Sequence, residues 1–298
     1  MRYLDDDFMR ALTEKGFLNP ILRKVIIDKD LDLQIRKYYI NIYYKGNSIL
    51  KLEKKSNQYK ANIHDKFLKG TDNIKDLIDE KWVEHYLEQL PKLKENILIK
   101  GGKRSMEIEY EQLIIRSNNL EKRVNSEYFI IDRQYAAERE NSDRFDLTGI
   151  YWSGKNRKRG QRVPLVCMEV KYSLNKDIQE IDVQLNKYYV HLEKRIKTIA
   201  EESTMVLKQK IELGIIIPDK ERREALSTLS ISDSINEVQF IVILVDYNPN
   251  SVLFERAIEK LKKLPFKNQI KIFKGGLAMW EEELRDLDKY ETNHPSRR

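Results

Sequence analysis

Two stretches decide the fold of this chain: Arg144-Phe-Asp-Leu-Thr-Gly-Ile-Tyr-Trp152 and Val163-Pro-Leu-Val-Cys-Met-Glu-Val-Lys-Tyr172. Both are rich in apolar and β-forming residues, and a basic, glycine-bearing loop over residues 153–162 separates them. They predict two neighbouring strands that can pair as a hairpin, although the long loop leaves their register open.

A long amphipathic helix is predicted directly after these strands, beginning near Lys176. Its apolar residues recur every three or four positions, which places them on one face of a helix. They are Ile178, Ile181, Leu185, Tyr188, Leu192, Ile196 and Ile199. The pattern favours a helix that is packed along that face.

The same reasoning extends this region in both directions. Upstream we expect a helix over residues 106–116, with Ser105 as its N-cap, and a strand over residues 128–136. Downstream we expect strands at 213–217 and 240–245, a helix at 253–264 and a short last strand at 270–273. This order of elements predicts an α/β domain with a central mixed sheet flanked by helices.

The first part of the chain has a different, β-rich character. Residues 31–44 and 48–53 favour a hairpin around Lys45-Gly46-Asn47, and residues 59–67 favour a third strand. A helix is expected over residues 72–90, ending at Pro91, whereas residues 1–27 suggest a short helix and an apolar connection through Pro20.

We therefore predict three parts in the chain. They are an accessory module over residues 1–95, a main domain over residues 96–290 and a disordered polar tail over residues 291–298. The sequence contains no internal repeat and no low-complexity segment.

The composition indicates a globular protein with a heavily charged surface. Of 298 residues, 41% are hydrophobic and 35% are charged, and the net charge of +7 permits a polyanionic partner such as nucleic acid. The single cysteine, Cys167, excludes an internal disulfide, and four scattered histidines make a zinc site unexpected. Because no apolar run approaches the ~20 residues of a membrane span, we expect a cytoplasmic protein without a membrane partner.

Three charged residues of the two deciding strands form the candidate site. Glu169 and Lys171 are two residues apart on one strand and therefore point to the same face. Asp146, near the start of the preceding strand, could come close to them if the strands pair. Buried carboxylates are costly unless they bind a cation, and two hard oxygen ligands suit Mg²⁺ or Mn²⁺. Lys171 could then orient or deprotonate the water that attacks a phosphodiester.

The chain contains its own control for this pattern, because Glu53 and Lys55 repeat the spacing with Asp32 upstream. That copy is followed by Ser-Asn-Gln instead of a helix, and its strands are typical of a solvated hairpin. For Glu169 and Lys171 the alternative is a cross-strand ion pair at the edge of a sheet. Their apolar neighbours and the helix downstream favour the functional interpretation.

The order helix, strand, Asp-bearing strand, Glu-x-Lys strand, helix resembles the core of the PD-(D/E)XK nuclease superfamily. The residues that carry the resemblance are Arg144-Phe-Asp146-Leu and Met168-Glu169-Val-Lys171, and Gln184-Leu-Asn-Lys-Tyr188 resembles the Gln-x-x-x-Tyr motif of RecB-like members. The resemblance covers about residues 105–275 and implies a restriction-endonuclease-like core beside the N-terminal β-rich module. Phe145 stands where the name of the superfamily has Pro.

The resemblance implies a role for each residue of the site. Asp146 and Glu169 would hold the metal, with the carbonyl of Val170 as a further ligand, and Lys171 would serve the attacking water. Gln184 and Tyr188, four residues apart on one helical face, would help to position substrate. The alternative for this pair is helix packing by Tyr188 beside an incidental Gln184.

The first helix of the family often supplies a further glutamate to the metal site. Glu107, Glu109 and Glu111 compete for this role. Glu109 is our choice because it lies one turn before Gln112 and Leu113. At least two of the three glutamates are expected on a solvated face of the helix.

The sequence thus predicts a metal-dependent nuclease that hydrolyses phosphodiester bonds in DNA, or in RNA. The basic run over residues 155–162 could bind phosphates or form a solvated loop, and the Tyr-rich hairpin over residues 38–44 could stack bases or serve packing. The alternatives are a non-catalytic nucleic-acid-binding protein and a regulatory partner protein with the same fold. The sequence does not distinguish DNA from RNA, endo- from exonucleolytic cutting, or one oligomeric state from another.

Overall fold

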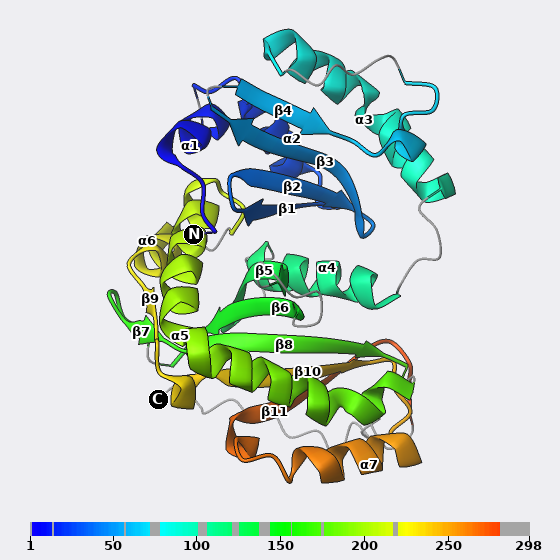
Figure 1. Ribbon diagram of the computed structural model, residues 1–298, viewed down its shortest axis with the longest axis vertical. Helices are drawn as coiled ribbons and strands as arrows, with labels where there is room; N and C mark the ends of the chain where they lie inside the picture. Colours follow the sequence, from blue (N-terminus) through cyan, green and yellow to red (C-terminus); the bar gives the residue numbers. More distant parts are fainter. Residues whose placement is uncertain are drawn as a thin grey trace, which may run out of the picture.

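The computed structural model describes the chain except for residues 1, 14, 57, 72–77, 101–105, 121–124, 137–143, 156, 174–175, 217–219 and 281–298. The predicted N-cap Ser105 and the predicted tail therefore lie outside the described residues. Figure 1 shows a smaller sheet formed by the N-terminal part of the chain, above a larger sheet formed by the rest.

The larger sheet has the two deciding strands near its centre. Its strand order is β11-β10-β8-β6-β5. The bounds are Tyr128–Ala136 for β5, Arg144–Tyr151 for β6, Leu165–Tyr172 for β8, Gln239–Val245 for β10 and Ile270–Gly275 for β11. β8, β10 and β11 are parallel, whereas β6 is antiparallel to both of its neighbours. The predicted mixed sheet is therefore confirmed.

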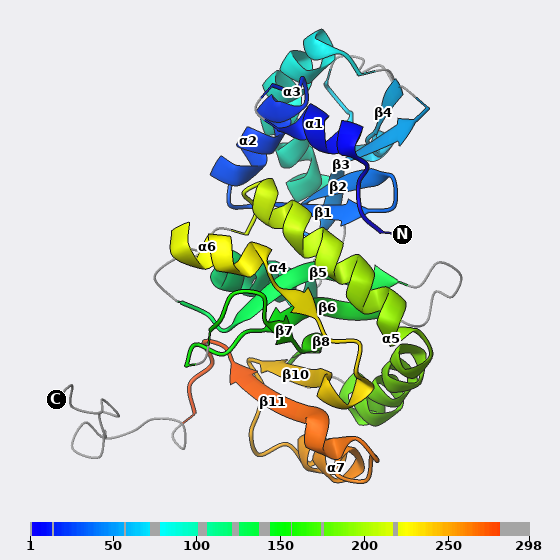
Figure 2. The same ribbon diagram turned by 90° about the vertical axis from the view of Figure 1, so that its left-hand side faces the viewer.

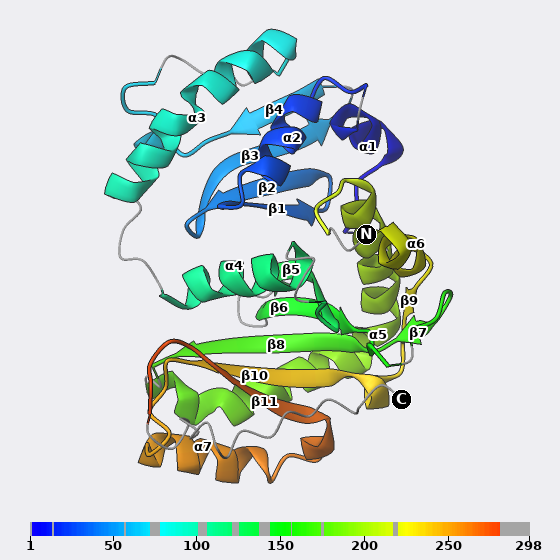
Figure 3. The same cartoon turned by 180° about the vertical axis from the view of Figure 1, so that it is seen from behind.

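Helices cover both faces of this sheet, as Figures 1 and 3 show. On one face α5 (Ile181–Glu212) follows the 3₁₀ turn η2 (Lys176–Glu180), and α7 (Val252–Leu261) packs beside it. On the other face α4 (Met106–Asn119) places Ile115 against a second hydrophobic cluster that includes Val166 and Met168. Both helix faces bury apolar side chains, so the central strand β8 is covered on both sides.

The smaller sheet is antiparallel throughout, in the order β1-β2-β3-β4. Its strands are β1 (Leu31–Arg36), β2 (Tyr39–Tyr44), β3 (Asn47–Lys55) and β4 (Gln58–Asn62). Lys45 and Gly46 join β2 to β3 with φ of 47° and 76°, which is the two-residue turn that twisted hairpins prefer. Three helices accompany this sheet, α1 (Asp6–Leu12), α2 (Asn19–Ile27) and α3 (Glu80–Lys100).

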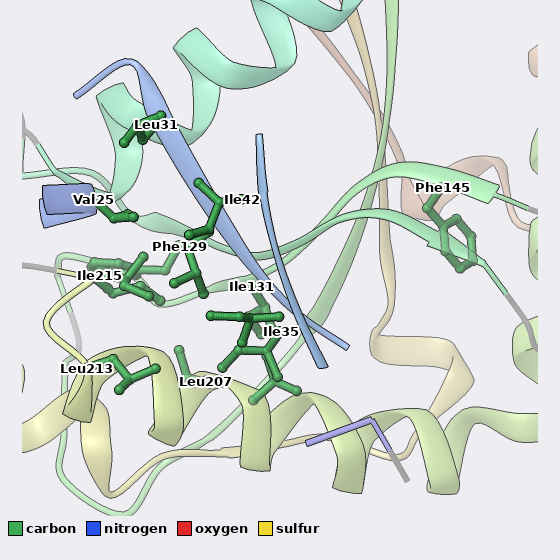
Figure 4. Close-up of a cluster of buried hydrophobic side chains, with 14 of the residues drawn as sticks. Val25, Leu31, Ile35, Ile42, Phe129, Ile131, Phe145, Leu207, Leu213 and Ile215 are labelled. Carbon is green, nitrogen blue, oxygen red and sulfur yellow. The ribbon is translucent and has the colours of Figure 1, made fainter. Parts of the chain in front are cut away.

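One continuous hydrophobic cluster joins the smaller sheet to the larger one. In Figure 4 its labelled members come from both parts: Val25, Leu31, Ile35 and Ile42 from the N-terminal part, and Phe129, Ile131, Leu207, Leu213 and Ile215 from the rest. Burial of such a side chain contributes about 1.5–3 kcal/mol to folding. The two sheets therefore share a core, and the predicted boundary at residue 95 falls inside α3.

Two predictions about proline are wrong. The predicted apolar connection through Pro20 is the start of α2, because proline fits the first turn of a helix, where its missing N–H needs no partner. Pro91 was expected to end a helix, yet it lies inside α3. The helix continues through it while burying Tyr86, Leu90 and Leu93, so packing outweighs the lost hydrogen bond.

The predicted strand at residues 213–217 is also absent from the part of that segment that the structure describes. Leu213 to Ile216 form the turn that ends α5, and α6 (Lys220–Ser227) follows. A short parallel pair, β7 (Arg162–Val163) and β9 (Ser230–Ile231), lies beside the larger sheet. No helix among the described residues is both long and apolar enough to cross a membrane.

Candidate functional site

Glu169 forms the centre of the candidate site. It lies on β8 and only 2% of its surface is exposed. Its Oε1 accepts hydrogen bonds from Lys171 Nζ at 2.7 Å and from Gln184 Nε2 at 2.6 Å, and its Oε2 accepts one from the Tyr188 hydroxyl at 3.0 Å. Three other predicted site residues, one from the same strand and two from α5, therefore meet on a single carboxylate.

Asp146 approaches this carboxylate from β6. At this end the last paired position of β6 and β8 is Leu147 opposite Met168, and beyond it Asp146 Oδ2 accepts a hydrogen bond from the Val170 N–H at 2.9 Å. Burial first, and then the neighbouring carboxylates of Glu169 and Glu111, raise the pKa of Asp146 well above its ordinary value. Carboxylates gathered in this way favour the uptake of a proton or of a divalent cation.

Lys171 is almost completely buried beside these carboxylates, with 7% of its surface exposed. Burial alone would lower the pKa of Lys171, but the charges of Glu169 and Asp146 outweigh burial and raise it above its ordinary value. The side chain is therefore an ammonium group at neutral pH. In this state it can orient a water molecule or a phosphate oxygen, but it is poorly suited to removing a proton.

Two glutamates of α4 face this site. Glu107 Oε1 accepts a hydrogen bond from the Tyr172 N–H at 3.3 Å and also raises the pKa of Lys171. Glu111 lies one turn further along the helix and is 2% exposed. Burial raises the pKa of Glu111 to about 7; Arg133 opposes this rise and Glu169 adds to it.

The structure does not bring Glu109, the choice made from the sequence, to the site. It lines a pocket between α4 and the N-terminal module, together with Gln112 and Leu113. Residues two apart lie on nearly opposite sides of a helix, so Glu109 and Glu111 point in different directions. Ile115 could have indicated which glutamate faces the site. It packs on the sheet and lies one turn after Glu111 on the same face of α4.

α5 supplies Gln184 and Tyr188, which interact with each other as well as with Glu169. Gln184 Nε2 lies 2.7 Å from the Tyr188 hydroxyl oxygen. Burial, and then Glu169, raise the pKa of Tyr188, so its hydroxyl keeps its proton and donates. The ring of Phe145 packs edge-on against Tyr188 with centroids 4.5 Å apart. The buried Phe145 ring thus forms part of the apolar surface next to the Tyr188 side of the site.

The donors present fit a magnesium or manganese ion held by few protein ligands. Asp146 and Glu169 are hard oxygen donors, and the raised pKa of Asp146 reflects negative charge that a cation would neutralise. Within the described residues, no group of three His, Cys, Asp or Glu side chains is arranged to hold a metal. Mg²⁺ is commonly bound by one or two carboxylates, while waters and substrate phosphates complete its shell. The carbonyl of Val170 stays a predicted ligand.

The basic run after β6 lies at the far end of the hairpin from this site. Asp146 is near the start of β6, and the loop leaves after Tyr151, about 16 Å further along the strand. Arg157 donates to the Ser126 carbonyl at 2.7 Å, and Arg159 pairs with Glu224 at 2.9 Å. These contacts indicate that the basic run is a surface loop held by its own neighbours. They do not support its role as a phosphate-binding segment of the site.

Sequence reasoning missed one buried charge near the site, Arg133 of β5. Its Nε lies 3.4 Å from Glu111 Oε2, and 1% of the residue is exposed. No motif marks it, because a single arginine in a β-rich segment is usually exposed. Arg133 comes close to α4 because β5 pairs with β6 in the sheet and α4 packs on β5.

Comparison with known proteins adds no constraint to this geometry. No family model, no curated protein and no solved structure matches the chain.

Proposed function

We propose that this protein is a metal-dependent phosphodiesterase of the PD-(D/E)XK type that acts on nucleic acid, with DNA as the expected substrate. The observation that supports it is the arrangement of Lys171, Gln184 and Tyr188 on the buried Glu169 carboxylate, with Asp146 beside it. An ion pair that only stabilised the sheet would need one carboxylate and one ammonium. A second carboxylate with a raised pKa is costly for folding, and such costs are typical of functional sites.

Each residue has a chemical role in this proposal. Asp146 and Glu169 would hold Mg²⁺ or Mn²⁺, which when bound would polarise a phosphoryl oxygen and stabilise the negative charge that develops on it. Lys171, as an ammonium group, would orient the attacking water and the phosphate oxygens. Gln184 and Tyr188 fix the orientation of Glu169 through their hydrogen bonds, which keeps its geometry ready before substrate binds.

A second candidate function is a non-catalytic nucleic-acid-binding or regulatory protein that retains this fold. One observation favours it: both oxygens of Glu169 already accept hydrogen bonds from side chains, which is also how a carboxylate with a purely structural role is satisfied. The two candidates differ in whether the protein binds a divalent cation.

The deciding experiment measures cleavage of plasmid DNA, single-stranded DNA and RNA with Mg²⁺ or Mn²⁺. Wild type is compared with Glu169→Ala and Lys171→Ala. Glu53→Ala and Lys55→Ala are the matched controls, because they remove the same residue types at the same spacing from β3. Cutting that disappears only in the first two variants supports the proposal. No cutting of any substrate, together with no Mn²⁺ binding by calorimetry, contradicts it and favours the non-catalytic protein.

A further inference from the structure

Arg133 lies in a layer of buried charges between the two sheets. A β-bulge in β5, where pairing with β6 shifts between Ile130 and Asp132, precedes it. Asp132 and Arg133 engage different partners: Asp132 pairs with Arg36 of β1, while Arg133 lies close to Asp32 of β1 and to Glu111. Bulges commonly redirect side chains in this way and are frequent beside active sites.

The guanidinium of Arg133 is shared between two carboxylates from different parts of the chain. Nη1 lies 3.7 Å from Asp32 Oδ2 of the N-terminal module, and Nε lies 3.4 Å from Glu111 Oε2 of α4. The group also lies over the ring of Tyr43, 4.4 Å from its centroid. Among the described residues none of its three nitrogens makes a hydrogen bond. Its charge is therefore balanced by these two carboxylates and by the aromatic ring.

The module side of this arrangement is held in place by further polar contacts. Gln34 Nε2 donates to Asp32 Oδ1 at 2.6 Å, and Lys210 Nζ of α5 donates to Gln34 Oε1 at 2.8 Å. Arg36 Nη2 donates to the carbonyl of Arg133 itself at 2.6 Å. In Figure 2 the end of α5 lies against β1, where these contacts form. These contacts hold the Asp32 carboxylate in the orientation in which it faces Arg133.

The other side of the arrangement ends at the candidate site. Glu111 lies one turn after Glu107, which accepts a hydrogen bond from the Tyr172 N–H of β8, on the helix α4 that packs on this strand. The charge of Glu111 also raises the pKa of Asp146. A buried carboxylate with no cation beside it would turn away or take up a proton. Arg133 is the cation whose charge opposes this for Glu111.

We propose that Arg133 is a positioning residue: held by Asp32, it orients the Glu111 carboxylate toward Asp146 and Glu169, so that the N-terminal module completes the metal site. This inference rests on the proposed function, because it assigns Glu111 to the surroundings of the same cation. It also gives the module a task that the predicted boundary at residue 95 did not suggest. A main domain cut free of the module would lack Asp32 and leave Arg133 with one carboxylate.

The test is Mn²⁺ binding to the full-length protein by calorimetry, with melting temperatures recorded for every variant. Arg133→Met keeps the volume of the side chain and removes its charge, and Glu111→Gln removes its target. Residues that orient metal ligands typically change metal affinity by about 10–100-fold, so each substitution should weaken Mn²⁺ binding by about tenfold or more. The double variant should be no weaker than the poorer single variant, because both changes remove the same contact.

Lys94→Met is the control for this cycle. Lys94 of α3 is a partly buried cation that pairs with Asp28, and it contacts neither Arg133 nor Glu111 in any ion pair of the described residues. It should lower the melting temperature while leaving Mn²⁺ affinity within about twofold of wild type. If Arg133→Met does not fold, Asp32→Asn replaces it and should weaken Mn²⁺ binding in the same direction by a smaller factor.

The outcomes separate the two proposals. Wild type that binds Mn²⁺ while folded Arg133→Met, or Asp32→Asn in its place, binds it equally well overturns the positioning role and leaves the proposed function standing. Losses that add in the double variant overturn it too, because Arg133 would then act by another route. Wild type that binds no Mn²⁺ overturns both.

Discussion

The chain contains the same Asp…Glu-x-Lys pattern twice, and the two copies have become different structures. On β3 the Glu53–Lys55 ion pair is 3.6 Å long, and its side chains are 30% and 63% exposed. On β8 the Glu169–Lys171 pair is 2.7 Å long, and its side chains are 2% and 9% exposed. A pair in water contributes little to stability, whereas a buried pair must be matched by further polar contacts.

What surrounds each copy explains the difference. Asp32 lies on β1, with the whole of β2 between it and β3, so it cannot meet Glu53. Asp146 lies on β6, which pairs directly with β8, and α5 covers both strands with Gln184 and Tyr188. Spacing along the chain is therefore insufficient; a site requires adjacent strands and a helix that closes over them.

The largest contrast should appear in activity. Lys171→Met is expected to reduce metal-dependent cleavage by about 10²–10³-fold, because the cation that orients the attacking water and the phosphate oxygens is lost. Lys55→Met, the same change in the exposed copy, should leave the rate unchanged. Initial rates on the substrate that wild type cuts provide the measurement, and equal rates in the two variants would show that the copies do not differ in function.

The next contrast concerns pH. Because burial raises the pKa of Glu111 from 4.5 to about 7, the folded protein keeps a proton that the unfolded chain releases in this range. The stabilisation that the folded state gains from the proton on Glu111 is therefore present at low pH. It is lost as pH rises from about 4.5 to about 7.

Urea unfolding in EDTA checks this sign. The stability of Glu111→Gln relative to wild type should improve by about 3 kcal/mol between these two pH values, since one unit of pKa corresponds to about 1.4 kcal/mol. Glu53→Gln, on the exposed hairpin, is the control. A constant difference between Glu111→Gln and wild type over this range would contradict the assignment.

Metal should stabilise only through the buried copy. At a Mn²⁺ concentration of about 100 times its dissociation constant, the free energy of unfolding of wild type should rise by about 2.7 kcal/mol. Asp146→Asn should abolish the rise, whereas Glu53→Gln should retain it. Thermal unfolding with and without Mn²⁺ gives the comparison, and a rise that persists in Asp146→Asn would place the ion elsewhere.

The smallest effect tests the cover supplied by α5. Tyr188→Phe removes one hydrogen bond to Glu169 and should lower the free energy of unfolding by about 1 kcal/mol. Tyr59→Phe removes an exposed hydroxyl that donates to the Asp7 carbonyl at 3.3 Å, and its effect should be smaller. Urea unfolding of both variants decides; equal effects would mean that the hydrogen bond of Tyr188 adds nothing beyond an exposed one.

The strands of the main sheet could be predicted because their sequence signal is local. β5, β6, β8 and β10 are apolar runs of strand length, and α5 follows from its apolar spacing. The errors arose where packing overrides local preference. Pro91 continues a helix because its neighbours are buried, and the apolar run at Leu213 serves the shared core as a turn.

The candidate site could be predicted as far as its residues come from the two strands and from α5. Asp146, Glu169, Lys171, Gln184 and Tyr188 are indeed brought together. Their roles stay predictions. The sequence could not choose among the glutamates of α4, because that choice depends on how the helix is rotated over the sheet, and Ile115 is a weak marker of that rotation. The role of Arg133 could not be predicted from the sequence, because its partners Asp32 and Glu111 lie 101 and 22 residues upstream.

The layer of charges between the sheets also has a consequence for how the chain is made. The Leu4 N–H donates to Gln209 Oε1, although the two residues are 205 positions apart in the sequence. Gln34 likewise accepts its hydrogen bond from Lys210, which is synthesised much later. At synthesis rates of about 5–20 residues per second, β1 leaves the ribosome on the order of ten seconds or more before the end of α5 exists. During that interval Gln34 can already donate to Asp32 on the same strand, but its own contact with Lys210 is missing. We therefore expect the face of β1 that carries Gln34 to stay in contact with water until synthesis has passed residue 210, so that the layer supporting Glu111 is completed late.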